Sequence, residues 1–342
     1  MSVQAETPPG ETDVIQGERA LRRKRLSVRD YGIIVFLIGI AAALSATSSS
    51  FRTGANFSNI VNQMSWQGIA ACGATLTIVS GGFDLSQGAV YAFCAIVAVM
   101  TAGSLGAFGA FILAILVGLG LGAFNGAVIA FGGINSFIAT LATSYVFLGL
   151  ATVITGGNVA STSVSHFMVM NDVYGLTVAS WLFIVVALVT GVLLAFTRFG
   201  RGLYAIGGNP EAARLSGIRI SFYRVVVFSL SGACAGIAGV IAASQAGSAD
   251  PRIGSTLALT SIAATVVGGT SIMGGEGAIW RAVVGALILE LINNGFVLLN
   301  LNPVYEDVVF GALVLLAVGL DVLLRRRGTW RLSLWGRRRS AS

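Results

Sequence analysis

Long apolar segments alternate with short polar ones along nearly the whole chain. A helix needs about 20 apolar residues to cross the hydrocarbon core of a membrane, and most of the segments approach that length. They are Gly32–Ser48, Ile60–Val79, Ala89–Ala102, Phe108–Phe131, Phe137–Thr155, Thr177–Thr197, Val225–Ser244, Leu257–Val267, Ile279–Leu299 and Val308–Leu324. The third and the eighth are short, and each adjoins a glycine-rich run, Ser80–Gly82 or Gly268–Gly277. The pattern predicts an all-α polytopic membrane protein with about ten transmembrane helices, least sharply bounded near those two runs.

Positive charge is distributed unevenly between the two sides of such a threading. All but two of the 21 Lys and Arg residues lie on one side. They are Arg19, Arg22, Arg23, Lys24, Arg25 and Arg29; Arg198, Arg201, Arg214, Arg219 and Arg224; Arg281; and Arg325, Arg326, Arg327, Arg331, Arg337, Arg338 and Arg339. Because basic residues near the ends of spans resist translocation, this side is predicted to be cytoplasmic and to hold both termini. Only Arg52 and Arg252 remain for the outer side.

Composition supports the same interpretation. Hydrophobic residues make up 55% of the 342 positions and charged residues only 10%, against about 25% in an ordinary globular domain. We divide the chain into a disordered basic cytoplasmic tail at 1–30, a transmembrane domain at 31–325 and a second basic cytoplasmic tail at 326–342. The net charge of +7 comes from groups that flank apolar spans. It therefore favours anionic lipid headgroups over nucleic acid as the partner.

The residues that covalent catalysis needs are scarce. Lys24 is the only lysine, so no phosphate-binding loop of the type Gly-x-x-x-x-Gly-Lys-Ser/Thr is present. His166 is the only histidine, and it lies in an outer loop without a metal-binding or nucleophile motif nearby. Cys72, Cys94 and Cys234 lie in apolar stretches without ligand spacing. We expect no enzyme activity, cofactor or metal, so a pump of this kind would take its energy from an ion gradient or from a separate subunit.

One acidic residue lies deep in a predicted span. Carriers coupled to protons or sodium place ionisable groups at mid-membrane, and only Glu290 does so here, since Asp84 and Asp321 lie near cytoplasmic span ends. Glu290 is either a protonated packing residue or part of a polar pathway with Asn293 and Asn294. A single acid gives little support to proton coupling.

A short helix is predicted in the longest internal cytoplasmic loop. Asn209 can cap it, and Pro210 suits its first position. Glu211 near the start and Arg214 near the end complement the helix dipole, and Gly217 can adopt the left-handed conformation that ends it. The residues alone leave two roles open, an ordinary connector on the headgroups or a rigid docking element for a partner.

Two apolar spans end in similar sequences. Thr77–Gly82 (TIVSGG) resembles Thr265–Gly269 (TVVGG), and in each case a pair of glycines closes the span. Many transporters consist of duplicated halves. Duplication and chance in a chain rich in Gly, Ala and Val both remain open.

Four motifs carry a resemblance to a known family. They are Gly81–Gly88 (GGFDLSQG), Gly132–Leu141 (GGINSFIATL), Tyr204–Ile218 (YAIGGNPEAARLSGI) and the glycine-rich Thr265–Gly277. In this order and spacing, over about residues 30–325, the chain resembles bacterial ABC sugar importer permeases of the ribose/xylose/galactose type. These are the inner-membrane components of binding-protein-dependent transport systems. The third motif is the strongest match. Phe83 and Ser136 stand where the family more often has Ile and Pro, and Glu290 is unexpectedly acidic.

The resemblance implies that residues 31–325 form a permease domain in the bacterial inner (plasma) membrane. Such a subunit moves a monosaccharide or related polyol to the cytoplasm by alternating access, in an ATP-driven importer. The implied partners are a second permease copy, two ABC-type ATPase domains and a periplasmic sugar-binding protein. Coupling to the ATPase is assigned to Asn209, Pro210, Glu211, Ala212, Ala213, Arg214, Leu215, Gly217 and Ile218.

Two further sets of residues are expected to act in transport. An inner gate or structural motif is assigned to Gly81, Gly82, Asp84, Ser86 and Gly88. A neutral sugar needs hydrogen-bonding groups and aromatic faces, which Asn62, Gln63, Trp66, Asn135, Thr140, Asn293 and Asn294 would supply along the path. Each of these could equally form a helix–helix hydrogen bond. The alternatives to a sugar importer are a permease for branched-chain amino acids or nucleosides, an ion-coupled secondary carrier and a passive channel.

Overall fold

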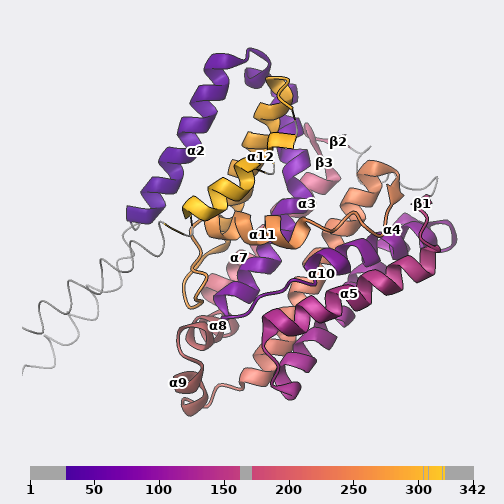
Figure 1. The fold of residues 1–342 in the computed structure, drawn as a ribbon, viewed down its shortest axis with the longest axis vertical. Coiled ribbons are helices and arrows are strands. Elements are labelled where there is room, and N and C mark those ends of the chain that lie inside the picture. Colours follow the sequence, from indigo (N-terminus) through magenta and orange to yellow (C-terminus); the bar gives the residue numbers. More distant parts are fainter. Residues whose placement is uncertain (1–27, 162–171, 303, 307, 318, 320–342) are drawn as a thin grey trace, which may run out of the picture.

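The computed structural model describes residues 28–161, 172–302, 304–306, 308–317 and 319, and helices dominate it (Figure 1). The helices are α2 (Val28–Thr47), the 3-10 turn η1 (Ser50–Arg52), α3 (Gly54–Val79), α4 (Gln87–Gly132), α5 (Ser136–Thr155), α7 (Val178–Phe196), α8 (Arg198–Gly208), α9 (Pro210–Leu215), α10 (Ile220–Ala246), α11 (Leu257–Val267) and α12 (Ile279–Leu298). The described residues of 304–317 are helical as well. The all-α prediction is therefore confirmed.

Two small antiparallel sheets are the only strands among the described residues. β1 (Ala160–Ser161) pairs with β4 (Ser248–Ala249), which joins the segments that follow α5 and α10. β2 (Asp172–Val173) pairs with β3 (Leu176–Thr177) in a hairpin just before α7. Of the predicted outer loop, residues 162–171 with His166 lie outside the described residues. The predicted tails also lie outside them, apart from residues 28–30, which open α2.

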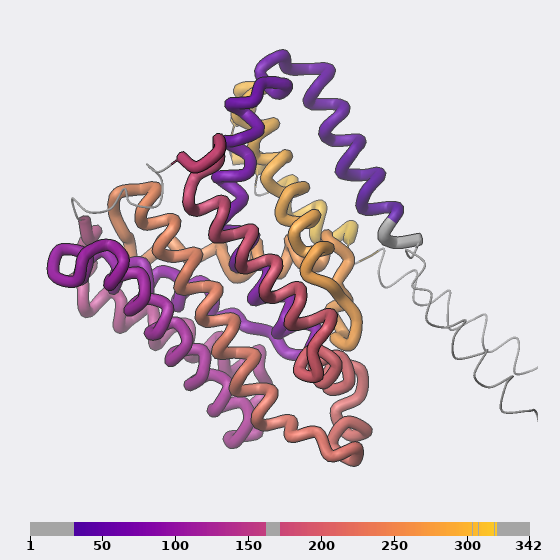
Figure 2. Tube along the Cα trace, turned by 180° about the vertical axis from the view of Figure 1, so that it is seen from behind, coloured from indigo at the N-terminus to yellow at the C-terminus, as the bar shows by residue number. Residues whose placement is uncertain are grey.

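Five of the described helices are long and apolar enough to cross a membrane, namely α4, α5, α7, α10 and α12. α4 covers two segments that the sequence predicts as separate spans. At Gly106 its backbone leaves the helical region, with φ 70° and ψ 167°, and the two arms fold back beside each other (Figures 1 and 2). The predicted boundary between the third and fourth spans is therefore a break at a glycine.

α11 is a short helix at the predicted glycine-rich site. Its 11 residues extend about 16 Å at 1.5 Å per residue, against about 30 Å for the hydrocarbon core. It packs against α3 and α12. Gly268 N and Thr270 N donate back to Ala264 O (2.9 Å) and Thr265 O (3.0 Å). The backbone groups at its end are thus satisfied within the chain, as an interruption at membrane depth requires.

Close helix packing in the core depends on small residues. α4 and α10 form the most extensive helix pair, and a β-carbon placed on Gly118 would lie 2.4 Å from Gly232 O. Small residues of this kind let two helix backbones approach each other in membrane proteins. α3 lies at the centre of the bundle and packs against α7, α10, α11 and α12. The interior is therefore organised around α3.

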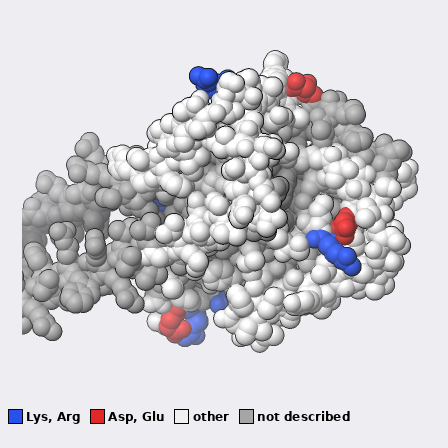
Figure 3. Space-filling view, turned by 45° about the horizontal axis from the view of Figure 1, so that its top comes forward, with Lys and Arg blue, Asp and Glu red and all other residues white. Residues whose placement is uncertain are grey.

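The two ends of the bundle are built differently. At one end α7 leads into α8 and α9, and α10 begins; we refer to this as the α9 end (Figure 2). At the opposite end the starts of α3 and α7 meet the end of α12. There Asn56 and Asn294 exchange hydrogen bonds of 3.1 and 2.8 Å, and Ser58 Oγ donates to Gly175 O at 2.9 Å. On the face shown in Figure 3, charged side chains occur in a few small groups and most of the surface is uncharged.

Candidate functional site

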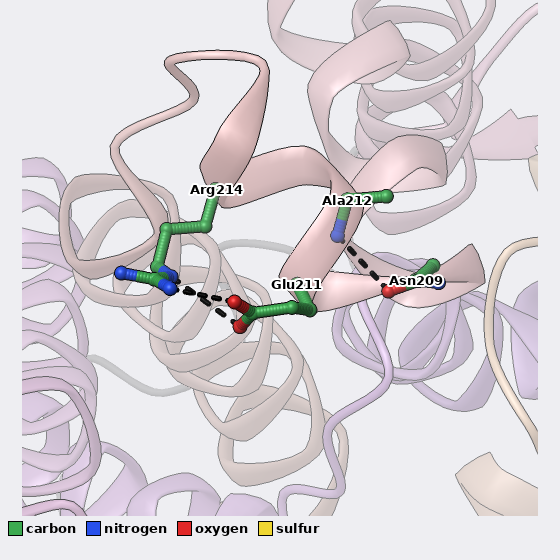
Figure 4. A network of polar contacts seen from close by, with 4 residues as sticks. All are labelled: Asn209, Glu211, Ala212 and Arg214. Carbon is green, nitrogen blue, oxygen red and sulfur yellow. Dashed lines mark hydrogen bonds and ion pairs between the residues drawn. The ribbon is translucent and has the colours of Figure 1, made fainter.

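α9 is present where the sequence predicts it, with both of its ends formed. Asn209 Oδ1 accepts a hydrogen bond from Ala212 N at 3.0 Å, and Pro210 occupies the first turn. Glu211 and Arg214 form an ion pair, with Arg214 Nε 3.3 Å from Glu211 Oε2 (Figure 4). Gly217, which follows the C-cap residue Ser216, has φ +82°. The result is a short, rigid helix that is capped at both ends by neighbouring residues.

α9 projects from the bundle and rests on it through one small residue. Ala213 is buried, whereas Pro210, Glu211, Ala212 and Arg214 are exposed. Leu215 is 77% exposed. Outside α9, Met273 at the same end is 73% exposed, a residue that the sequence reasoning did not select. An exposed rigid helix with large apolar groups at this end is suited to bind a partner protein.

α8 attaches α9 to the bundle. Its residues Gly202, Leu203 and Ile206 are buried, and Tyr204 Oη donates to Gly277 O at 2.7 Å. Burial raises the pKa of Tyr204 above its ordinary value, although the charge of Arg281 opposes the shift. The phenol therefore keeps its proton at neutral pH and can donate this bond.

Three glycine-containing segments meet directly before α9, and we call this contact the glycine joint. It consists of residues 79–82, residue 207 and residues 274–275. Gly275 N donates to Val79 O at 2.9 Å. A β-carbon on Gly207 would lie 1.9 Å from Val79 O and 2.5 Å from Gly275 N. Since both neighbours are backbone atoms, only glycine fits at position 207 without movement of the chain.

A buried polar network begins two residues after the glycine joint. Asp84 is 4% exposed. Its Oδ1 accepts from Ser86 N at 3.1 Å and from Ser86 Oγ at 2.6 Å, and its Oδ2 accepts from Ser231 Oγ on α10 at 2.7 Å. Asn125 Nδ2, in the second arm of α4, donates to Ser86 Oγ at 2.6 Å. Asp84 thus connects the start of α4 to its second arm and to α10.

Gln87 extends the network to two further helices. Its Nε2 donates to Ala70 O on α3 at 2.9 Å, and its Oε1 accepts from Ser261 Oγ on α11 at 2.6 Å. Phe83 N and Leu85 N donate to Ser136 Oγ (3.1 Å) and Thr140 Oγ1 (3.0 Å) of α5. The irregular segment 80–86 and the start of α4 are therefore held by hydrogen bonds to α3, α5, α10 and α11. Gly88 packs closely against the backbone of Gly254.

The seven residues expected to line a substrate path lie in two separate regions of the structure. Asn135 and Thr140 belong to α5 near the segment 80–86, where Asn135 Oδ1 caps α5 by accepting from Phe137 N at 2.9 Å. The others lie on α3 and α12, toward the opposite end. The structure does not bring all seven of them together.

Several of these residues take part in hydrogen bonds within the protein. Asn62 Oδ1 accepts from Thr177 Oγ1 at 2.8 Å and from Ser180 Oγ, and Asn294 pairs with Asn56. Trp66 is half-buried, with its ring centroid 5.9 Å from that of Tyr91. Gln63 is exposed and Asn293 half-buried. Among the seven, Trp66, Gln63 and Asn293 are the residues whose side chains make no hydrogen bond within the described residues.

The hydrogen-bond partners of Asp84, Ser86 and Gln87 in the buried network were not identified from the sequence. Ser231, Asn125 and Ser261 are buried polar residues in otherwise apolar helices, and that position in a span was the available signal. Glu290 is 4% exposed on α12, one turn before Asn294. Its burial agrees with the prediction of a deep acid.

Comparison with known proteins was made for the whole chain. Residues 56–318 match the family described as "Branched-chain amino acid transport system / permease component". The ribose import permease protein RbsC of Escherichia coli (strain K12) is 35% identical over 317 residues, which cover 91% of this chain and 98% of that protein. The D-allose transport system permease protein AlsC of the same strain is 37% identical, with 86% and 92% covered. RbsC of Bacillus subtilis (strain 168) is 39% identical, with 85% and 92% covered.

No solved structure matches this chain. The relatives confirm the resemblance found in the four sequence motifs, and with it a transport subunit rather than an enzyme. The match of most of the chain and the identity to these relatives show that the chain belongs to the permease-component family of membrane transport systems.

Proposed function

We propose that this chain is the permease subunit of an ATP-driven importer for a monosaccharide or related polyol. The observation that carries the proposal is the exposed, doubly capped α9 in a chain whose relatives are named as permeases for ribose and allose. A rigid helix attached to the bundle can transmit force from a docked subunit, whereas a flexible connector could not. ATP hydrolysis then takes place on a separate partner.

The proposed topology has about ten transmembrane helices in the bacterial inner membrane, with both termini in the cytoplasm. Arg198, Arg201, Arg214, Arg219 and Arg224 all lie at the α9 end, and basic loops remain cytoplasmic. The α9 end would therefore face the cytoplasm. The opposite end, with the β2–β3 hairpin, would face the periplasm.

Two copies of the chain would form the complete pathway with two ABC-type ATPase domains and a periplasmic sugar-binding protein. The ATPases would dock on Asn209–Ile218, where Leu215 offers an exposed apolar contact. Their closure would rock the helices between outward- and inward-facing arrangements. Rigid-body rearrangement of this kind needs packing with two stable states, which close contacts between small residues can provide.

The inner gate is assigned to Gly81, Gly82, Asp84, Ser86 and Gly88. Support comes from the buried network, in which Asp84 holds an irregular segment to α4 and α10. Moving this segment would rearrange several helices together. The sugar path would run along α3 and α12, with Trp66 as an aromatic face and Gln63 and Asn293 as hydrogen-bonding groups.

A second candidate is a permease for branched-chain amino acids. The name of the matching family favours it, whereas the relatives named above favour sugars. The buried Glu290 is the observation that would suit an ion-coupled carrier. These alternatives differ in substrate or in energy source, so transport measurements separate them.

The test is uptake into liposomes that contain this chain with its ATPase and binding protein. We expect ATP-dependent accumulation of labelled ribose, allose or arabinose, and no accumulation of labelled leucine. Liposomes with this chain alone should accumulate none of them. Uphill uptake by the chain alone under a proton or sodium gradient would overturn the proposal.

A further inference from the structure

We propose that Gly207 is a positioning residue, through which the glycine joint passes movement of α9 to the segment 80–88. The inference rests on the proposed function, because it concerns how a docked ATPase would act on the permease. It assigns a role to a residue that touches neither the ATPase site nor the substrate path.

The joint is a contact between backbones, with no side chain in between. A β-carbon on Gly207 would lie 1.9 Å from Val79 O, and one on Gly274 would lie 2.9 Å from Gly81 Cα and 3.0 Å from Gly207 O. Flexible side chains can absorb small displacements by changing rotamer, whereas packed backbone segments cannot. Movement of Gly207 must therefore displace residues 79–82.

The displaced segment leads straight into the buried network. Asp84 follows Gly82 by two residues and accepts from Ser231 Oγ of α10 at 2.7 Å. Gln87 accepts from Ser261 Oγ of α11 at 2.6 Å. Movement at the glycine joint therefore acts on hydrogen bonds to α10 and α11, two helices that have no direct role in docking.

The other side of the joint is attached to α12. Gly274 and Gly275 precede Ile279, the first residue of that helix, by a few positions. Tyr204 Oη holds the connecting segment through Gly277 O at 2.7 Å. α8 therefore contacts the chain before α4 and the chain before α12 at one place.

Two neighbouring glycines give a matched pair of variants. Gly207→Ala places its β-carbon against backbone atoms on two sides, whereas a β-carbon on Gly208 has no atom within 4 Å. Both variants add one methyl group at the end of α8, so they differ in the contact alone. The complex with ATPase and binding protein is assembled in liposomes, and sugar uptake and ATP hydrolysis are measured together.

We expect Gly207→Ala to keep complex assembly and basal ATP hydrolysis, while sugar delivered per ATP falls at least about fivefold, the lower end of usual coupling factors. Gly208→Ala should keep the wild-type ratio. A purely structural defect would lower the amount of complex and reduce both activities in proportion. The ratio of the two therefore separates transmission from folding.

Tyr204→Phe is a second variant that keeps the shape of the side chain and removes the bond to Gly277 O. It also tests the joint if Gly207→Ala fails to assemble, and we expect it to lower the same ratio by a smaller factor. Tyr223→Phe is its control, since the Tyr223 hydroxyl makes no hydrogen bond within the described residues. A wild-type ratio of sugar uptake to ATP hydrolysis in Gly207→Ala would overturn this inference and leave the proposed function standing. If Gly207→Ala does not assemble, a wild-type ratio in Tyr204→Phe has the same meaning. A wild-type complex that does not couple ATP hydrolysis to sugar uptake overturns the proposed function with it.

Discussion

At the scale of single residues, Asp84 is a buried acid with hydrogen bonds to both of its carboxylate oxygens. One oxygen accepts from the hydroxyl of Ser86, directly before α4, and the other from the hydroxyl of Ser231 on α10. A buried polar group is costly unless it is hydrogen-bonded, and here serine hydroxyls satisfy it. Its surroundings explain why an acidic residue is tolerated inside an apolar bundle.

Replacement of Asp84 by Asn is expected to reduce transport and stability. An amide offers one acceptor oxygen and brings two donors, so one of the buried serine hydroxyls loses its acceptor, at a cost of about 1–3 kcal/mol. Sugar uptake in the reconstituted complex and the midpoint of thermal unfolding in detergent measure the two effects. Asp172→Asn is the control, because Asp172 is exposed on β2. Normal uptake by Asp84→Asn would remove Asp84 from the inner gate.

At the scale of elements, α9 is determined by residues close to one another in the sequence, whereas the helix bundle depends on contacts between helices that are far apart in the sequence. The cap, the first-turn proline and the terminal glycine of α9 lie within ten consecutive residues, so the sequence predicted this helix and its ends correctly. The same cannot be said of Asn62 or Asp84. Their partners Thr177 and Ser231 lie 115 and 147 positions away, and a pattern along the chain does not say which distant helices meet.

The cap of α9 gives a test of docking. Asn209→Ala removes the acceptor for Ala212 N and should cost about 1 kcal/mol of helix stability. The affinity of the permease for its ATPase should fall by up to about fivefold if the helix must be formed for docking. Asn209→Ser retains an acceptor oxygen and should bind as the wild type does. Equal affinities of the two variants, measured by co-purification at graded ATPase concentrations, would contradict a docking role for the formed helix.

The contact between α4 and α10 gives a test of packing. Gly118→Ala would place a β-carbon 2.4 Å from Gly232 O, and overpacking of this kind costs about 1–3 kcal/mol. Gly120→Ala, two residues along the same helix, meets no atom within 4 Å. The thermal unfolding midpoint should therefore fall for Gly118→Ala and stay the same or rise slightly for Gly120→Ala. Equal midpoints would show that the two helices can separate at no cost.

At the scale of the whole molecule, apolar patterning predicted the class of protein and the place of every helix longer than 15 residues in the described part of the chain. It did not predict the glycine joint, which needs three segments from different parts of the chain. It also placed seven polar residues on one path, whereas the structure divides them between α5 and the pair α3 and α12. Patterning reports which residues face an apolar environment, and it carries no information on which helices are neighbours.

The orientation in the membrane can be tested with single cysteines. Ser216 follows α9 and is exposed, and Tyr174 at the tip of the β2–β3 hairpin is 96% exposed. A membrane-impermeant maleimide should label Tyr174→Cys in intact spheroplasts and Ser216→Cys only in inverted vesicles. The native Cys72, Cys94 and Cys234 are buried and should give little background. Labelling of Ser216→Cys from outside would invert the proposed topology.

The similar endings of α3 and α11 now have a stereochemical cause. Gly82 N donates to Thr77 O and Thr270 N to Thr265 O, with Gly81 and Gly269 at φ +80° and +90°. A helix that ends with hydrogen bonds of this kind most often has glycine at that position, because the backbone there takes a positive φ. This steric demand accounts for the glycine in both segments without a common ancestor, because a helix that ends in this way favours the same residue wherever it occurs.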